Sequence, residues 1–135
     1  MAAPDARPHP ITIVGSGSIG AGWAIVFARA GFRVTLNDIS ADQLDKARTM
    51  IGERLAELDS FALLGDHPTA IAERIRLDVD LEAAVAHADL VIEAAPENLD
   101  LKRQLFARLA AATHDATILA SSSSALTASA IADGL

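Results

Sequence analysis

The sequence predicts a doubly wound α/β domain, in which helices cover both faces of a parallel sheet. Short apolar segments rich in β-branched residues alternate along the chain with longer amphipathic segments. The connections between successive strands are long enough to hold helices, which implies crossovers between parallel strands. With 135 residues, of which 51% are hydrophobic and 21% charged, one packed core can form and disorder is not expected.

The first strand, helix and second strand follow directly from local patterns. The run ITIVG at 11–15 is short and apolar, as expected for a strand buried on both faces. Small and apolar residues at helical spacing come next, and Gly31 is expected as the C-cap of that helix. The run FRVTLND at 32–38 alternates apolar and polar residues, which predicts the second strand.

A helix pair is expected after the second strand, over residues 41–75. Ser40 and Gln43 form a capping-box pattern at its start. An apolar stripe at 3–4 spacing then marks the buried face of the first helix. It consists of Leu44, Ala47, Ile51, Leu55 and Leu58. The Gly-Asp-His-Pro turn at 65–68 separates this helix from a shorter one.

The second half of the chain continues the alternation. Three further strands are expected at 75–80, 89–95 and 116–121. A short helix capped by Asp80 lies between the first two, and Pro96 ends the second. An amphipathic helix precedes the last strand, and another begins near Thr127 or Ser129. The inward residues expected on the amphipathic helix are Leu101, Leu105, Phe106 and Leu109.

The chain ends and the overall charge narrow the function classes. Residues 1–10 hold three prolines and no apolar core, so we expect a disordered tail followed by one domain over 11–135. The net charge of −7 argues against sequence-independent nucleic-acid binding. No apolar run reaches the roughly 20 residues needed to cross a bilayer, and we expect a cytoplasmic location.

Metal and thiol chemistry are not expected. The chain has no cysteine, so disulfides and thiolate ligands are excluded. No group of His, Asp and Glu residues has metal-ligand spacing. His67, His87 and His114 lie at breaks or helix ends and are expected at the surface.

A glycine fingerprint opens the first helix. Gly15, Gly17 and Gly20 form G-x-G-x-x-G directly after a buried strand, the context in which this pattern marks a dinucleotide site. Gly15 permits the tight turn, Gly17 lets a pyrophosphate approach the backbone, and Gly20 allows close packing of helix on strand. The alternative is a glycine-rich turn without a ligand. The loop residues expected to contact the cofactor are Gly15, Ser16, Gly17, Ser18, Ile19 and Gly20.

An acid ends the second strand at the spacing of a ribose-binding residue. Asp38 lies 18 positions after Gly20, close to the roughly 20 at which a carboxylate accepts bonds from the adenosine ribose. The next residues, Ile39 and Ser40, supply no arginine for a 2′-phosphate, so NAD is favoured over NADP. Asp38 and Ile39 are both expected to contact the cofactor. A solvated strand-end aspartate is the alternative. FAD domains share the fingerprint and stay a minor alternative.

Three stretches resemble a known family over about residues 11–135. They are IVGSGSIGAGWAIVFARAGFRVTLNDI, VIEAAPENLDLKRQLFARL and ILASSSSALTASAIA. The chain resembles the Rossmann-type NAD-binding domain of the L-3-hydroxyacyl-CoA dehydrogenases, enzymes of fatty acid metabolism. Trp23 in the first stretch makes it most similar to the lambda-crystallin / L-gulonate 3-dehydrogenase branch.

The resemblance assigns roles to particular residues. It implies that Ala94 and Glu97 line the nicotinamide-ribose side and that Lys102 contacts the cofactor. It implies that Ser124, the last of four consecutive serines, contacts both substrate and cofactor and is catalytic. Serine stands at 122, where the family typically has asparagine. The general-base histidine of the family, in a His-x-x-Asn-Pro motif, would lie beyond Leu135.

The implied reaction is hydride transfer between NAD and the 3-hydroxy carbon of a 3-hydroxyacyl-CoA. An L-gulonate dehydrogenase is the close alternative, and a non-catalytic, crystallin-like NAD-binding protein is the alternative from another class. The family also implies a helical substrate domain that makes the homodimer, and we expect that domain and one further strand of the sheet beyond this chain. We therefore expect the chain alone to bind NAD without completing catalysis.

Overall fold

The computed structural model describes residues 7–123 and 126–135 and contains a five-stranded parallel sheet in the order β3-β2-β1-β4-β5. The strands are β1 (Arg7–Val14), β2 (Phe32–Asn37), β3 (Ile75–Asp78), β4 (Leu90–Glu93) and β5 (Ile118–Ser121). The helices are α1 (Ser18–Arg29), α2 (Ala41–Ser60), α3 (Pro68–Glu73), α4 (Leu81–Val85), α5 (Leu99–Ala112) and α6 (Ala128–Ile131). The predicted doubly wound α/β fold, with a helix pair (α2 and α3) after the second strand, is confirmed.

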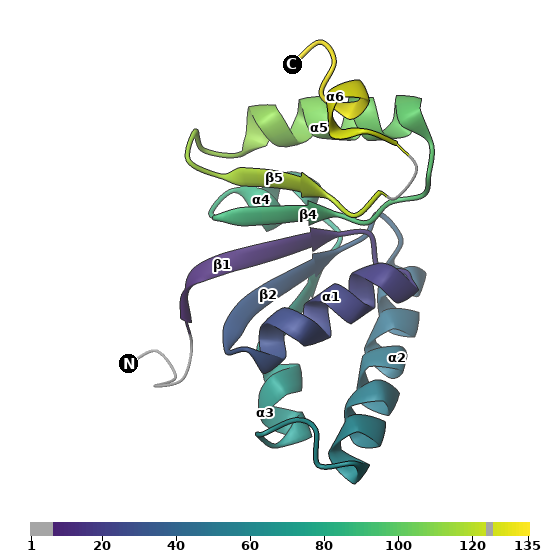
Figure 1. Cartoon of the computed structure of the whole chain (residues 1–135), viewed down its shortest axis with the longest axis vertical. Helices are drawn as coiled ribbons and strands as arrows, with labels where there is room; N and C mark the ends of the chain where they lie inside the picture. Colours follow the sequence, from purple (N-terminus) through teal and green to yellow (C-terminus); the bar gives the residue numbers. More distant parts are fainter. Residues whose placement is uncertain (1–6, 124–125) are drawn as a thin grey trace.

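Helices cover the two faces of the sheet in two groups. Helices α1, α2 and α3 lie on one side, and α4, α5 and α6 on the other (Figure 1). The chain changes sides after β3, and the strand order changes direction there as well, because β4 pairs with β1 rather than β3. Such a point leaves a crevice at the carboxyl ends of the strands, where ligands bind in open α/β sheets.

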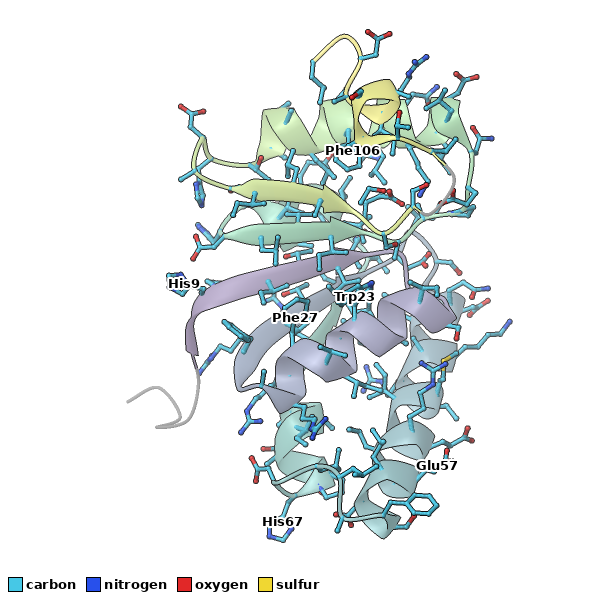
Figure 2. All side chains as sticks on the ribbon, viewed as in Figure 1. His9, Trp23, Phe27, Glu57, His67 and Phe106 are labelled. Carbon is cyan, nitrogen blue, oxygen red and sulfur yellow. The ribbon has the colours of Figure 1, made fainter. Side chains whose placement is uncertain are left out.

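Each face has its own apolar core. Ile11, Ile13 and Leu36 pack with the buried stripe of α2 on one face. Val14, Val91 and Phe106 pack together on the other, where Figure 2 shows Phe106 in the layer of α5. The α2 stripe is as predicted, with Leu44, Ala47, Ile51 and Leu55 buried. Alternation along β1 explains the division, since successive side chains point to opposite faces.

Strand β1 begins earlier than the sequence predicts. Residues 7–10 were expected in a disordered tail, yet they belong to the strand, and Arg7 pairs with Phe32. The register shifts between Arg7 and Ile11, which accommodates the two prolines there because proline cannot donate to a ladder. Asp89 N donates to Pro10 O, and the His9 ring lies 2.9 Å from the Asp89 carboxylate. The rest of the expected tail, residues 1–6, lies outside the described residues.

The helix ends follow the predicted caps. Ser40, Asp80 and Thr127 each accept a bond from the backbone N–H three residues on. Gly31 has φ +99°, the left-handed conformation expected just after a helix. These local signals fix where the helices begin and end.

The strands end in one transverse row at the carboxyl edge of the sheet. Across the sheet the row runs Asp78, Asn37, Val14, Glu93, Ser121. Four of its five members are polar, and Asn37 and Glu93 are buried. The residues that directly follow four of these strands therefore lie at the same edge. They are Gly15, Asp38, Ala94 and Ser122.

Within the described residues, no helix is both long and apolar enough to cross a membrane.

Candidate dinucleotide site

The glycine-rich turn between β1 and α1 needs two of its glycines for steric reasons. Gly15 has φ +104°, and a Cβ there would lie 2.6 Å from the carbonyl oxygen of Ala94 on the neighbouring strand connection. A Cβ on Gly20 would lie 1.7 Å from the carbonyl oxygen of Gly15. Both contacts are with backbone, so a side chain at either position would separate α1 from the sheet.

Gly17 differs because it faces open space. Among the described residues, no atom lies within 4 Å of a Cβ built on Gly17, which is the N-cap of α1 and offers no side-chain cap. The first bond inside the helix runs from Ala21 N to Gly17 O. The N–H groups of residues 18–20 therefore have no partner within the helix and lie at its positive end. This arrangement can bind a phosphate through the backbone.

Asp38 lies beside this turn and is held by neutral donors. Its Oδ2 accepts from both the backbone N and the Oγ of Ser16, at 3.1 and 2.8 Å. Its Oδ1 accepts from Ser40 N at 3.1 Å. The half-buried carboxylate thus has a fixed orientation at the end of β2, with no cationic partner among these contacts.

A cleft of about 850 Å³ opens at this edge of the sheet. It is lined by residues singled out from the sequence, namely Gly15, Ser16, Gly17, Ser18, Ile19, Asp38, Ile39, Ala94 and Glu97. Side chains of α4 and α5 form its far wall, namely Leu81, Leu101, Gln104, Leu105 and Arg108. The cleft is therefore bounded by the phosphate-binding turn, the strand-end acid and a wall of three leucines with Gln104 and Arg108.

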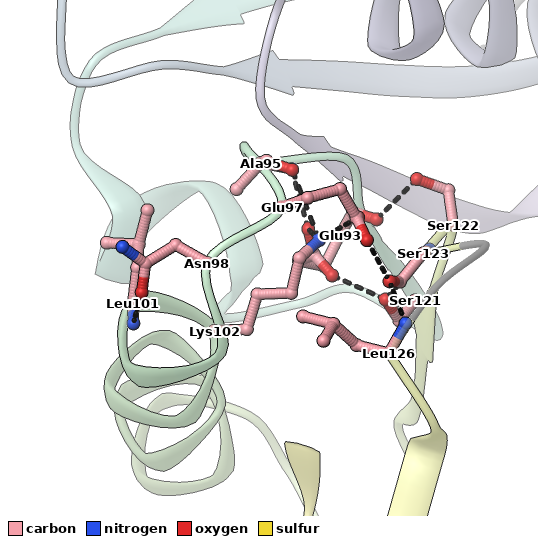
Figure 3. A network of polar contacts seen from close by, with 10 residues as sticks. All are labelled: Glu93, Ala95, Glu97, Asn98, Leu101, Lys102, Ser121, Ser122, Ser123 and Leu126. Atoms are coloured by element: carbon pink, nitrogen blue, oxygen red, sulfur yellow. Dashed lines mark hydrogen bonds and ion pairs between the residues drawn. The ribbon is translucent and has the colours of Figure 1, made fainter. Parts of the chain in front are cut away.

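Lys102 lies in a buried ionic network next to the cleft (Figure 3). Its side chain and that of Glu93 are both 0% exposed, and Nζ lies 2.5 Å from Glu93 Oε2. Nζ also lies 3.1 Å from Glu97 Oε1 and donates to the Ala95 carbonyl at 3.1 Å. Three acceptors thus surround the ammonium, as a buried charge requires.

The serine run after β5 is bonded to the same network. Ser121 Oγ donates to Glu93 Oε1 at 2.5 Å, and Ser123 Oγ donates to Glu97 Oε2 at 2.6 Å. Ser122 donates twice to the Glu93 carbonyl, from N and from Oγ. Leu126 N donates to Ser123 Oγ, which fixes the far side of the loop. Ser121, Ser122 and Ser123, which we call the serine loop, therefore make specific contacts with β4 and with Glu97 in the β4–α5 connection.

The structure brings together most of the predicted site residues. Gly20 packs directly against the Gly15 carbonyl and does not line the cleft, in keeping with its expected packing role. Lys102 is absent from the cleft wall, and it contacts two of the residues that line the cleft, Ala95 and Glu97. Ser124 lies outside the described residues. His67, His87 and His114 are exposed as predicted.

Two features of the site were missed from the sequence. Glu93 was read only as part of a buried strand, although a carboxylate inside the apolar run DLVIEAA requires a partner when buried. Leu101 was expected in the core but is 42% exposed and faces the cleft. Its helical spacing cannot distinguish a face turned to the core from one turned to a cleft.

An ion pair between Arg108, at the far wall of the cleft, and Glu82 changes the pKa of the acid. The Arg108 guanidinium donates to the Glu82 carboxylate at 2.7 Å, and this hydrogen bond lowers the pKa of Glu82. Among the described residues, no group of three or more His, Cys, Asp or Glu side chains is placed to hold a metal ion.

Comparison with known proteins decides the family. The profile of the family described as "3-hydroxyacyl-CoA dehydrogenase, NAD binding domain" matches residues 10–135. The chain belongs to this family. The resemblance and the NAD cofactor inferred from the sequence are thereby confirmed.

Individual members of the family show how far the similarity extends. A lambda-crystallin homolog of Bos taurus is 42% identical, over all of this chain and 43% of that protein. An L-carnitine dehydrogenase of Streptomyces griseus is 43% identical over 84% of this chain and 33% of its own length. The structure of 3-hydroxybutyryl-CoA dehydrogenase from Escherichia coli K12 superposes with a TM-score of 0.88 at 37% identity, covering 96% of this chain and 27% of that one. The chain spans less than half the length of these relatives.

The cleft fits the NAD that the family binds. The open space at Gly17 and the first-turn N–H groups of α1 suit the pyrophosphate, and Asp38 suits the adenosine ribose. NAD itself supplies the hydride chemistry when bound, and the protein supplies binding and orientation. Glu97, at the other end of the cleft, has a side chain that is 46% exposed.

Proposed function

We propose that this NAD-binding domain serves an oxidoreductase that transfers hydride between NAD and the 3-hydroxy carbon of a 3-hydroxyacyl-CoA. The observation that carries the proposal is the convergence of three parts at one sheet edge. The phosphate-binding turn, the ribose-binding acid and the serine loop border one cleft, with Ser122 among its lining residues. A substrate oxygen held near the serine loop would thus lie at the opposite end of the cleft from Asp38.

The residues of this chain bind and orient rather than perform covalent chemistry. Ser121 and Ser123, the serines before Ser124, are fixed by hydrogen bonds to Glu93 and Glu97. We propose that the Ser124 hydroxyl bonds the substrate oxygen, and that Glu97 contacts the nicotinamide ribose. Holding both reactants in place can supply a large share of a rate enhancement. Lys102 then acts through Glu97, whose orientation it fixes.

Two specific findings favour a small, CoA-free substrate as the alternative. The lambda-crystallin homolog and the L-carnitine dehydrogenase are 42% and 43% identical to this chain. A sugar acid such as L-gulonate, or L-carnitine, is therefore the second substrate class. A non-catalytic, crystallin-like NAD-binding protein is the alternative from a different class.

We further propose a cytoplasmic location and a homodimer formed through a domain outside this chain.

Calorimetric titration of the chain with NAD tests the binding half of the proposal. We expect one NAD per chain, and Asp38→Ala should weaken binding by about 10- to 100-fold, because a ribose bond to a charged acceptor is lost. Asp115→Asn, at an exposed position on the α5–β5 turn, is the matched control and should leave affinity unchanged. Failure of the wild-type chain to bind NAD would overturn the proposal.

Substrate class is tested in the whole protein that carries this domain. NADH formation should be measured with 3-hydroxybutyryl-CoA, L-gulonate and L-carnitine. Activity with the CoA thioester supports the leading proposal, and activity with either small acid supports the alternative. NAD binding without activity on any of the three would favour the non-catalytic protein.

A further inference from the structure

We propose that Ser16 is a positioning residue that sets the preference for NAD over NADP by holding the Asp38 carboxylate. The inference rests on the assignment of the cleft to NAD. It concerns the second position of the fingerprint, which lies between two glycines with steric roles and for which the fingerprint itself requires no particular side chain.

The contact is a double one from a buried residue. Ser16 is 2% exposed, and both its N–H and its Oγ donate to the same carboxylate oxygen, Asp38 Oδ2. Bonds from neutral donors to a charged acceptor are stronger than neutral pairs. Ser40 N donates to the other oxygen, so three donors on two segments fix the rotamer of Asp38.

This arrangement leaves acceptor capacity facing the cleft. An ionised carboxylate offers about four acceptor sites, and the three donors above occupy three of them. Asp38 and Ser16 both line the cleft. Ser16 therefore holds the carboxylate in the orientation from which it can accept a ribose hydroxyl and repel a 2′-phosphate.

The effect of Ser16 on the affinity for NADP should change sign when Asp38 is absent. Without the carboxylate, the Ser16 N–H and O–H would lose their acceptor, and Ser16 is one of the residues that line the same cleft. Buried donors without a partner are costly, and a phosphate oxygen can satisfy them. Ser16 would then favour a 2′-phosphate instead of excluding one. A merely structural serine would show no such reversal.

A double-mutant cycle tests the proposal on the chain itself. NAD and NADP affinities should be measured by calorimetry for the wild type, Ser16→Ala, Asp38→Ala and the double variant. We expect Ser16→Ala to weaken NAD binding by about 5- to 10-fold while NADP binding weakens less, which narrows the preference. Asp38→Ala should improve NADP binding, and adding Ser16→Ala should remove that gain without weakening NAD further.

Ser18→Ala is the matched control in the same turn. Ser18 is exposed, and its Oγ accepts from Arg54 rather than contacting Asp38. Ser18→Ala should change the affinities for NAD and NADP by the same factor. The melting temperature of each variant shows whether the fold is retained. Equal weakening of NAD and NADP by Ser16→Ala, or additive effects in the cycle, would overturn the role of Ser16. A wild-type chain that binds neither cofactor would instead overturn the assignment of the cleft.

Discussion

Two acids flank β1 at the carboxyl edge of the sheet, and their surroundings give them different roles. Asp38 follows β2, is half-buried, and is held by neutral donors from Ser16 and Ser40. Glu93 ends β4, is fully buried, and faces the Lys102 ammonium. Asp38 therefore keeps a negative charge available to a ligand, whereas the charge of Glu93 is compensated inside the protein.

The comparison separates binding from positioning. Both acids stand one strand away from β1, so place in the fold alone does not distinguish them. What differs is the partner, because a carboxylate with an ammonium at 2.5 Å has little left to offer a cofactor. Substitutions near Asp38 should affect the affinity for NAD, and substitutions near Glu93 should affect stability and the serine loop.

The largest effect is expected from breaking the buried pair. Lys102→Met leaves Glu93 as an uncompensated buried charge and should lower the free energy of unfolding by about 3–5 kcal/mol, measured by chemical denaturation. The other lysine of the chain provides the control. Lys46 is exposed on α2, so Lys46→Met should change the free energy of unfolding little. Combining Lys102→Met with Glu93→Leu should recover much of the loss. If Lys102→Met alone is as stable as the wild type, the Glu93–Lys102 pair contributes nothing to stability.

Two glycines of the fingerprint should separate stability from binding. Gly20→Ala places a Cβ against the Gly15 carbonyl and should cost about 1–3 kcal/mol of stability through overpacking. Gly17→Ala meets no atom of the described protein, so it should melt near the wild-type temperature but bind NAD at least about tenfold more weakly. Thermal melting and NAD titration of both variants check this. Normal NAD affinity in Gly17→Ala would place the pyrophosphate elsewhere.

The smallest effect is expected far from the cleft, where an acid has only a local role. The hydrogen bond from Arg74 lowers the pKa of Asp66 below its ordinary value. The stability it contributes is therefore present above the ordinary carboxyl pKa of about 4 and is lost as the pH falls through the lowered value. Asp66→Asn should melt slightly below the wild type at pH 7, and the difference should vanish in acid. A difference that persists at pH 2 would contradict this explanation.

Most of the fold could be predicted because its signals are local. The alternation of strands and helices, the caps at Ser40 and Asp80 and the fingerprint each depend on residues close together in the chain. The boundaries of β1 could not, because residues 7–10 join the strand through contacts with Phe32 and Asp89, which are distant in sequence.

The sequence by itself determined the parallel α/β fold, the glycine turn and the acid that follows the second strand. Spacing and side-chain size are sufficient for these features, because each is a property of one short segment. Only the tertiary structure decided that Lys102 is buried between Glu93 and Glu97, and that Ser16 bonds Asp38. Those contacts join segments that meet because parallel strands end in one row, so burial and partnership are set by the sheet.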